Sequence, residues 1–224
     1  MTDIVVGRFA SIFGGVILLT KLFERIFREG KPHPSFGKAH ILIVLLYIAS
    51  KEPIGRYKLS KELELSDSSI RTIIKYFKEL GLIKAIPKQG HVLSSEGKKL
   101  VKEIKKKLID IRTDLDLKEL TIGKFDAVCQ LRNVASKVKD GVTQRDEAIK
   151  VGADGATTII FEKNQLFIPP KPIEDLREIN EEIHGTLTSH FRLQDGDVLI
   201  VGTASDRKKA MEATIASALT LLLP

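Results

Sequence analysis

The sequence predicts an α+β fold made of two domains, and three observations support this prediction. Between residues 18 and 80 apolar residues recur mainly at the three- and four-residue spacing of helices with one buried face. After residue 121 short apolar runs alternate with helical patterns, which is typical of a sheet packed against helices. The charge also divides the chain, because residues 31–113 carry 18 Lys and Arg against 8 Asp and Glu, a net charge of +10, whereas residues 114–224 carry −4.

The composition excludes several classes of protein and site. The chain has 224 residues, 43% of them hydrophobic, which is enough for two domains with apolar cores. The single Cys129 excludes a disulfide framework and a thiolate metal cluster, and the five histidines lack ligand spacing. We therefore expect no metal and no cofactor. Many Lys, Glu and Ile residues with no Trp favour a thermophile's protein in a reducing cytoplasm.

Residues 1–34 are predicted to form an N-terminal helical extension. The apolar run FASIFGGVILLT at residues 9–20 is too short to span a bilayer, and it lacks the basic leader and cleavage site of a secretory signal. We therefore expect a cytoplasmic protein with no membrane partner. A helix over residues 18–28 places Leu19, Leu22 and Ile26 on one apolar face, which packs on its own domain or on a second subunit.

Residues 35–113 form the predicted first domain. Ser35 can cap a helix that runs to about Ser50, KEPIG breaks the chain, and a short helix follows from Arg56 to Leu63. Ser66 or Asp67 can cap the next helix, SDSSIRTIIKYFKEL at residues 66–80. Its inner stripe recurs at helical spacing and comprises Ile70, Ile73, Ile74, Phe77 and Leu80. Gly81 ends it in a left-handed position.

A basic hairpin and a basic helix complete the domain. LIKAI and HVLS are predicted strands around the turn PKQG, and Ser94 or Ser95 caps the helix GKKLVKEIKKKLIDI. This order of helices, hairpin and helix is the plan of a winged helix-turn-helix, in which one helix enters the DNA major groove and the wing reaches phosphates. Double-stranded DNA is the expected partner. The expected contacts are Ser68, Ser69, Arg71, Thr72, Lys75 and Lys78 on the helix, and Lys84, Lys88, Gln89 and His91 on the wing.

Two other readings of the basic domain stay open. Winged helices also serve as protein-interaction modules, although the +10 charge of residues 31–113 argues against an electrically silent surface. RNA is a second polyanion, but no aromatic stacking platform of the RNA-binding type occurs.

Much of the chain resembles a known family. The stretches PSFGKAHILIVLLYIA, PIGRYKLSKELELSDSSIRTIIKYFKELGLI, GVTQRDEAIKVGADGATTIIF and DVLIVGTASDRKKAMEATIASAL resemble archaeal winged-helix transcriptional regulators with an uncharacterised C-terminal domain. The resemblance covers nearly the whole chain beyond about residue 17. It implies DNA binding and regulation, without implying an effector.

Residues 114–224 form the predicted second domain. KFDAVCQLRN, ATTIIFEKNQLFIP and DVLIVG read as strands, the second of these stretches giving two. GVTQRDEAIKVG, a stretch starting at Pro172 or Ile173, and SDRKKAMEATIASALTLLL read as helices, the last capped by Ser205 or Asp206. The order β-α-β-β-α-β-α is a split β-α-β pattern, which predicts a ferredoxin-like antiparallel sheet with helices on one face.

No constellation in the second half predicts an enzyme. It lacks a nucleophile elbow, a phosphate-binding Gly-rich signature and paired metal ligands. Cys129 fits an inert core thiol, and His184 and His190 fit surface positions. Two helix starts are candidate sites for a small anionic ligand, one at Gln144, Arg145 and Asp146 and the other at Thr203, Ser205 and Asp206. The competing reading is structural: caps at Ser205 and Asp206, and an ion pair between Arg145 and Asp146.

The leading functional hypothesis is a DNA-binding regulator whose second domain dimerises or senses a small-molecule effector. A homodimer is expected because one recognition helix covers few base pairs, with the apolar first segment and ALTLLL at residues 218–223 as candidate contacts. An effector would act through its differential affinity for two arrangements of the dimer. The alternatives are an enzyme of small molecules with an accessory winged helix, and a protein-interaction module.

Overall fold

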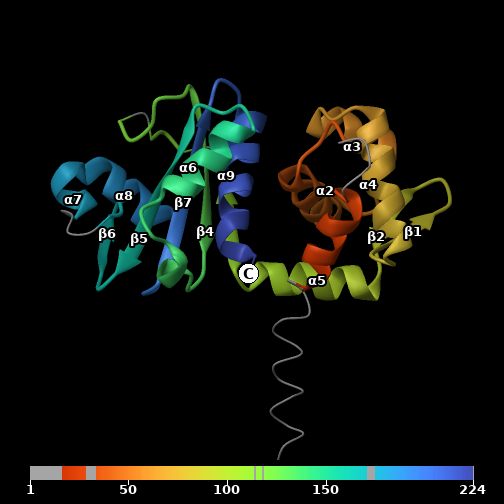
Figure 1. Ribbon diagram of the computed structural model, residues 1–224, viewed down its shortest axis with the longest axis horizontal. Coiled ribbons are helices and arrows are strands. Elements are labelled where there is room, and N and C mark those ends of the chain that lie inside the picture. The colour runs from red at the N-terminus through yellow and green to blue at the C-terminus, as the bar shows by residue number, and fades with distance from the viewer. Residues whose placement is uncertain (1–16, 29–33, 114, 118, 171–174, 224) are drawn as a thin grey trace, which may run out of the picture. The chain divides into compact units, whose positions relative to one another are not determined.

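The computed structural model (Figure 1) describes residues 17–28, 34–113, 115–117, 119–170 and 175–223. The chain divides between Lys105 and Lys106 into two compact units. The first contains helices and a two-stranded hairpin, and the second contains a five-stranded antiparallel sheet with helices. The α+β class predicted from the sequence is therefore confirmed. Among the described residues, no helix has the length and apolar character needed to cross a membrane.

The first unit begins with two apolar helices. Residues 17–26 are helical, and α2 spans Lys38–Lys51 with its apolar side chains buried. Phe27 packs edge-on against Phe36, and the Lys38 ammonium lies 5.8 Å from the centre of the Phe23 ring. The N-terminal helix thus packs on its own unit, while residues 1–16 lie outside the described part. Gly37 is the N-cap of α2; the prediction that Ser35 caps this helix is wrong, because the Ser35 hydroxyl bonds to Ser69 instead.

Helices α3 (Arg56–Leu63) and α4 (Asp67–Glu79) follow, with the bounds that the sequence predicted to within a residue or two. The Ser66 hydroxyl accepts a hydrogen bond from the Ser69 N–H and caps α4. The apolar stripe of α4 is buried, and Phe77 is fully inaccessible. Gly81 has a φ of +66°, the left-handed conformation that terminates a helix.

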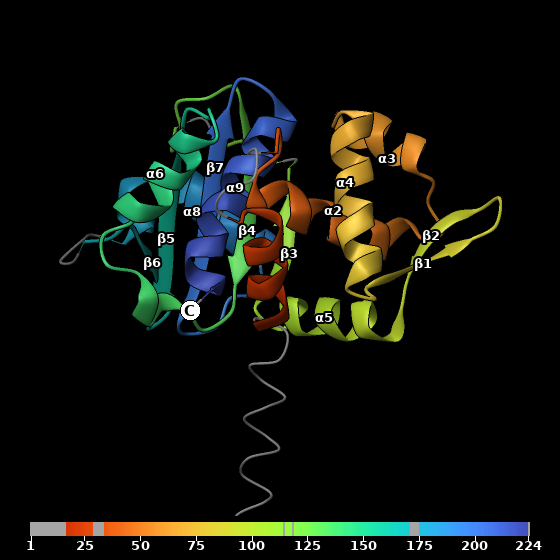
Figure 2. The same cartoon turned by 45° about the vertical axis from the view of Figure 1, so that its right-hand side comes forward.

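The hairpin of the first unit consists of β1 (Ile83–Ile86) and β2 (Gly90–Leu93), paired antiparallel. It extends away from the helices in both views of Figures 1 and 2. Ile54 and His91 exchange two main-chain hydrogen bonds of 3.0 and 2.8 Å, which tie β2 to the segment just before α3. The Ser94 hydroxyl accepts from the Gly97 N–H and caps α5 (Ser95–Lys105).

The boundary between the units differs from the sequence prediction. The helix that was predicted to run to about Ile111 ends at Lys105, and β3 (Leu108–Arg112) pairs antiparallel with β4 (Phe125–Leu131) of the second unit. The predicted boundary after residue 113 therefore lies too far along the chain. Val101, Ile104, Leu108 and Ile111 keep a helical spacing across the break, so the pattern alone does not reveal the strand.

The second unit is an antiparallel sheet with the order β3-β4-β7-β5-β6, completed by β5 (Gly155–Glu162), β6 (Gln165–Phe167) and β7 (Asp197–Ala204). Strands β4 and β5 run parallel on either side of β7 and are joined through α6 (Val142–Lys150), which makes a split β-α-β unit. The predicted ferredoxin-like order is wrong. That order places the hairpin strand, here β6, between the two parallel strands, whereas β6 lies at the edge.

Helices cover both faces of this sheet, and the prediction of helices on one face is wrong. One face carries α6 and α9 (Arg207–Leu222), and α9 packs along β4 and β7. The other face carries α7 (Leu176–Ile179) and α8 (Glu181–His190), whose Leu176, Ile183 and Leu187 pack with the alternate strand residues Val128, Ile159 and Leu199. Strands buried on both faces read as continuous apolar runs, as in DVLIVG.

One helix predicted in the second unit is two helices. Asn180 separates α7 from α8, and its side chain accepts a hydrogen bond from the Ile183 N–H as the cap of α8. Asp175 caps α7. The predicted start at Pro172 or Ile173 lies outside the described residues.

Candidate nucleic-acid interface

The outward face of α4 carries most of the residues predicted to contact DNA. Arg71, Lys75 and Lys78 are exposed, as is Ser68, and Thr72 is half-buried. Ser69 lies on the opposite side, only 4% exposed, with its hydroxyl within 2.9 Å of Ser35 and 2.8 Å of Ser66. The prediction that Ser69 contacts DNA is therefore wrong, because the residue holds α4 against the segment before α2.

The hydroxyl groups near the start of α4 are engaged within the helix. The Ser68 hydroxyl bonds to that of Ser66 at 2.9 Å, and the Thr72 hydroxyl donates to the Ser68 carbonyl at 2.9 Å. Each still has accepting capacity on its oxygen. Because the hydroxyl proton of Thr72 is already donated within the helix, Thr72 is a poorer donor to a base edge than its position suggested.

Asp67 holds two arginines of the first unit. Its Oδ2 accepts from Nη2 of Arg71 at 3.0 Å, and its Oδ1 lies 3.0 Å from Nε of Arg56 at the start of α3. Arg71 is one helical turn along from Asp67, whereas Arg56 arrives from another helix. Sequence reasoning omitted Arg56, because its position beside Asp67 depends on how α3 and α4 pack.

Glu79 plays the corresponding role at the other end of α4. It accepts from Arg25 at 2.8 Å and lies 3.9 Å from the ammonium of Lys75. Asp67, Arg71, Lys75 and Glu79 are spaced four residues apart, so they form one charged row along the helix. Arg56 pairs with Asp67 at one end of the row and Arg25 pairs with Glu79 at the other. With these two arginines the net charge of the row is positive.

The hairpin presents its polar residues in two places. Lys84, Lys88 and Gln89 are exposed, and Lys88 sits in the turn with a φ of +61°. His91 is only partly exposed and lies in β2 opposite Ala85, beside Ile54. The wing residues predicted from the sequence therefore divide into three exposed side chains and one partly buried histidine.

An open hollow of about 600 Å³ lies between α4, the start of α3 and β2. Its polar lining consists of Arg56, Arg71, Lys75, Lys78, Glu79 and His91. Burial, together with the nearby charge of Lys78 and then Arg56, lowers the pKa of His91 below its ordinary value of 6.5, against a hydrogen bond with the Ile54 main chain that raises it. The imidazole is therefore neutral at pH 7. Its Nδ1 is buried and has no hydrogen-bond partner in the part of the chain that the structure describes.

The first candidate ligand site of the second unit, at the start of α6, is built from structural contacts. Gln144 is 4% exposed and donates to the Thr220 hydroxyl at 2.6 Å, so it joins α6 to α9. Arg145 is exposed and pairs with Asp146 at 3.3 Å. The three side chains do not converge on a common point, because Gln144 faces inward and the other two face solvent.

The second candidate site, at the start of α9, is likewise engaged. Asp206 accepts from the N–H groups of Lys208 and Lys209 at 3.0 and 2.8 Å, which is the capping role named as its alternative. Thr203 is buried, and its hydroxyl accepts from the Gly123 N–H at 3.0 Å. Ser205 is exposed beside them. The N–H groups of Lys208 and Lys209, which an anion at this helix start would need, already donate to Asp206.

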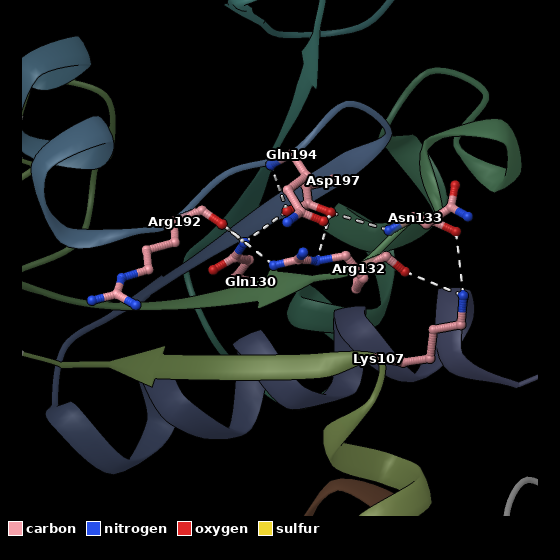
Figure 3. Close-up of polar contacts among 7 residues, drawn as sticks. All are labelled: Lys107, Gln130, Arg132, Asn133, Arg192, Gln194 and Asp197. Atoms are coloured by element: carbon pink, nitrogen blue, oxygen red, sulfur yellow. Dashed lines mark hydrogen bonds and ion pairs between the residues drawn. The ribbon is translucent and has the colours of Figure 1, made fainter.

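A buried carboxylate that sequence reasoning missed organises one end of the sheet (Figure 3). Asp197 is fully buried at the start of β7, and its oxygens accept three hydrogen bonds. Oδ2 accepts from the Gln130 amide at 2.7 Å and the Gln194 N–H at 3.0 Å. Oδ1 accepts from the Asn133 N–H at 3.2 Å and forms an ion pair with Arg132, whose Nε lies 3.1 Å away. All four neighbouring groups are N–H groups that join the carboxylate to β4 and to the segments beside it, so the cluster is structural.

Two further residues of the second unit have structural positions. Cys129 is fully buried in β4, and burial raises the pKa of its thiol to about 12, as suits an inert core residue. His184 is 7% exposed, so its predicted surface position is wrong, whereas His190 is exposed.

Comparisons with known proteins match both units. Residues 40–99 match a family model described as the PH0730-like N-terminal domain, and residues 122–221 match one described as a domain of unknown function (DUF4443). The solved structure of the hypothetical protein PH0730 from Pyrococcus horikoshii OT3 is 25% identical and superposes with a TM-score of 0.67, covering 84% of this chain and 93% of that one. No curated protein matches significantly. The chain is thus similar to an archaeal protein of the same architecture.

Proposed function

We propose that residues 38–105 form a winged helix-turn-helix that binds double-stranded DNA, and that the protein regulates transcription. The observation that carries the proposal is the set of exposed cations on one face of α4 and on the hairpin that follows it. Arg71, Lys75 and Lys78 lie on the outward face of α4, and the hairpin that follows adds Lys84 and Lys88. A helix of this size fits the major groove while a hairpin reaches flanking phosphates.

The charge distribution supports the same proposal. Residues 31–113 carry a net charge of +10, which creates a field that attracts a polyanion over distances of about a Debye length. Homodimerisation remains part of the proposal, because a two-fold operator would be matched by two copies of α4. Ala218, Leu219 and Leu221 of the segment ALTLLL are buried within the chain. A dimer contact through this segment is therefore disfavoured.

Selection of bound sequences from random duplex DNA by the full chain tests the proposal. A regulator should enrich a defined motif, and its affinity should fall steeply with salt, by a slope of about −0.9 in log K against log salt for each phosphate contacted. If no motif is enriched but the affinity for DNA still falls steeply with salt, the protein is a general DNA binder. No binding at low salt would refute the proposal.

A further inference from the structure

The hollow beside α4 differs from an ordinary basic surface because its cations come from separate segments. Arg56 belongs to α3, Lys75 and Lys78 belong to α4, and His91 belongs to β2. Such convergence requires the folded unit, since Arg56 and His91 are 35 positions apart in the sequence. Four permanent cations line the hollow against the single carboxylate of Glu79, so its interior favours an anion.

The two arginines of the hollow are held in place. Asp67 contacts both Arg56 and Arg71 at 3.0 Å, which limits the positions of their guanidinium groups before any ligand arrives. A guanidinium donates in a planar fork that matches two oxygens of a phosphate. Ordering these side chains in advance reduces the entropy that a ligand must overcome. The arrangement therefore suits an oxyanion such as a phosphate.

We propose that this hollow is a phosphate-binding site, and that it anchors a backbone phosphate of the DNA beside α4. The inference rests on the proposed function and deepens it, because it assigns the hollow to backbone positioning. Ser68 and Thr72 are left as the polar groups nearest to the bases. The volume of about 600 Å³ is much larger than one phosphate, so a sugar on either side also fits.

A change in the pKa of His91 can report whether a phosphate occupies the hollow. In the protein alone, burial and the cations Lys78 and Arg56 lower the pKa of His91. A phosphate in the hollow adds negative charge beside the imidazole and favours its protonated form. The other groups facing it are Arg71, Lys75 and Glu79 of α4 and the main chain of Ile54.

The sign of the pH effect follows from linkage. Binding raises the pKa of His91, so binding takes up a proton, and affinity must increase as the pH falls through the raised pKa. Affinity becomes independent of this group once the pH is below the lowered pKa of the protein alone. Well above the raised pKa the imidazole is neutral in both forms and makes no pH-dependent contribution.

The test measures binding of the full chain to a fluorescent duplex, as a function of salt and pH. Lys78→Gln should reduce the magnitude of the salt slope by about 0.9 and weaken binding about eightfold at 0.1 M salt. Lys61→Gln is the matched control, because Lys61 is exposed on α3 and does not line the hollow. His91→Gln should abolish the rise in affinity at low pH while leaving affinity at pH 8 within about twofold.

Three outcomes separate this inference from the proposed function. If DNA binds but Lys78→Gln and His91→Gln behave like Lys61→Gln, the hollow is not a phosphate site and the DNA proposal stands. If DNA does not bind but inorganic pyrophosphate raises the pKa of His91 in NMR titrations, the site takes a free phosphorylated ligand and the DNA proposal fails. The resonance is identified by its loss in His91→Gln. If DNA does not bind and pyrophosphate leaves the pKa of His91 unchanged, both proposals fail.

Discussion

Nη2 of Arg71 donates to Oδ2 of Asp67 at 3.0 Å, and the same carboxylate contacts Arg56. An acidic residue thus stands on the face proposed to meet DNA. Asp67 orders the two guanidinium groups, but its carboxylate also competes with phosphate for their N–H donors and repels phosphate, and we expect this opposing effect to be the larger. Asp67 therefore limits the electrostatic part of binding, which does not depend on sequence.

Asp67→Asn should strengthen non-specific DNA binding by releasing Arg71 and Arg56. The salt slope should grow in magnitude by up to about 0.9 for each arginine that gains a phosphate contact. The ratio of specific to non-specific affinity should fall, which filter binding on the selected site and on a scrambled duplex measures. Asp146→Asn is the matched control, because Asp146 has the same side-chain exposure, 49%, and also pairs with an arginine. Equal effects of the two substitutions would contradict the prediction.

Lys88→Ala should weaken binding to all duplexes alike. Lys88 is exposed in the hairpin turn, and a phosphate contact from there carries no sequence information. Arg71→Ala should also weaken binding to all duplexes alike, because Arg71 lines the hollow proposed to hold a backbone phosphate. A loss larger by about 1 to 3 kcal/mol on the selected site would instead show that Arg71 contacts a base. If Lys88→Ala changes the selected motif, the hairpin contacts bases and the phosphate role of Lys88 is wrong.

Gly90→Ala should destabilise the first unit by about 2 kcal/mol or more. Gly90 has a φ of +121°, and an added Cβ would meet the Ile54 carbonyl carbon at 2.3 Å. The substitution should separate β2 from the segment just before α3. Urea denaturation followed by tyrosine fluorescence measures the loss, because Tyr47, Tyr57 and Tyr76 all lie in the first unit.

The control for this substitution is Gly37→Ala, at the N-cap of α2 in the same unit. An added Cβ there meets nothing within 4 Å and the φ of −98° suits alanine, so the cost should be below about 1 kcal/mol. A loss of stability in Gly37→Ala similar to that of Gly90→Ala would show that the close approach to Ile54 is not the cause.

Cys129 should resist thiol reagents in the native protein at pH 7 to 9. Its side chain is fully buried, and burial raises its pKa to about 12, so the thiolate form is absent in this range. Labelling then requires the second unit to open. Mass spectrometry should show labelling that follows the urea transition, and rapid labelling without urea would contradict the burial of β4.

Asp197→Asn should destabilise the second unit by about 2 to 4 kcal/mol. All four groups around the carboxylate are donors, so an amide nitrogen in its place would face another N–H. Labelling of Cys129 in urea measures the change. Asp195→Asn is the control, because Asp195 is exposed and its one contact, from the Lys163 N–H, can be accepted by an asparagine.

The sequence was sufficient to predict several helix starts, because these depend on residues that are close neighbours along the chain. Capping serines and aspartates placed the starts of α4, α5 and α9, because a cap acts within three residues. Contacts between distant segments were not predictable in the same way. The Ser69 hydroxyl bonds to that of Ser35, and Arg56 forms an ion pair with Asp67. Asp197 accepts a hydrogen bond from Gln130 of β4.

The same division explains the errors in strand assignment and order. β3 continues the helical spacing of α5, so only its pairing with β4 identifies it. The spacing of apolar residues also cannot predict that β7 lies between β4 and β5, because an apolar strand can occupy any central position in a sheet. The hollow was missed for a related reason: three of its segments meet only in the folded unit.

The position of β7 has a consequence for synthesis of the protein. Strands β3 and β4 can pair as soon as they leave the ribosome, as can β5 and β6, but β7 must arrive before the two pairs can join. The first unit is complete at Lys105 and requires none of these strands. During translation the first unit should therefore be folded while the later part of the nascent chain is still an open sheet, which makes that part the natural client of a chaperone.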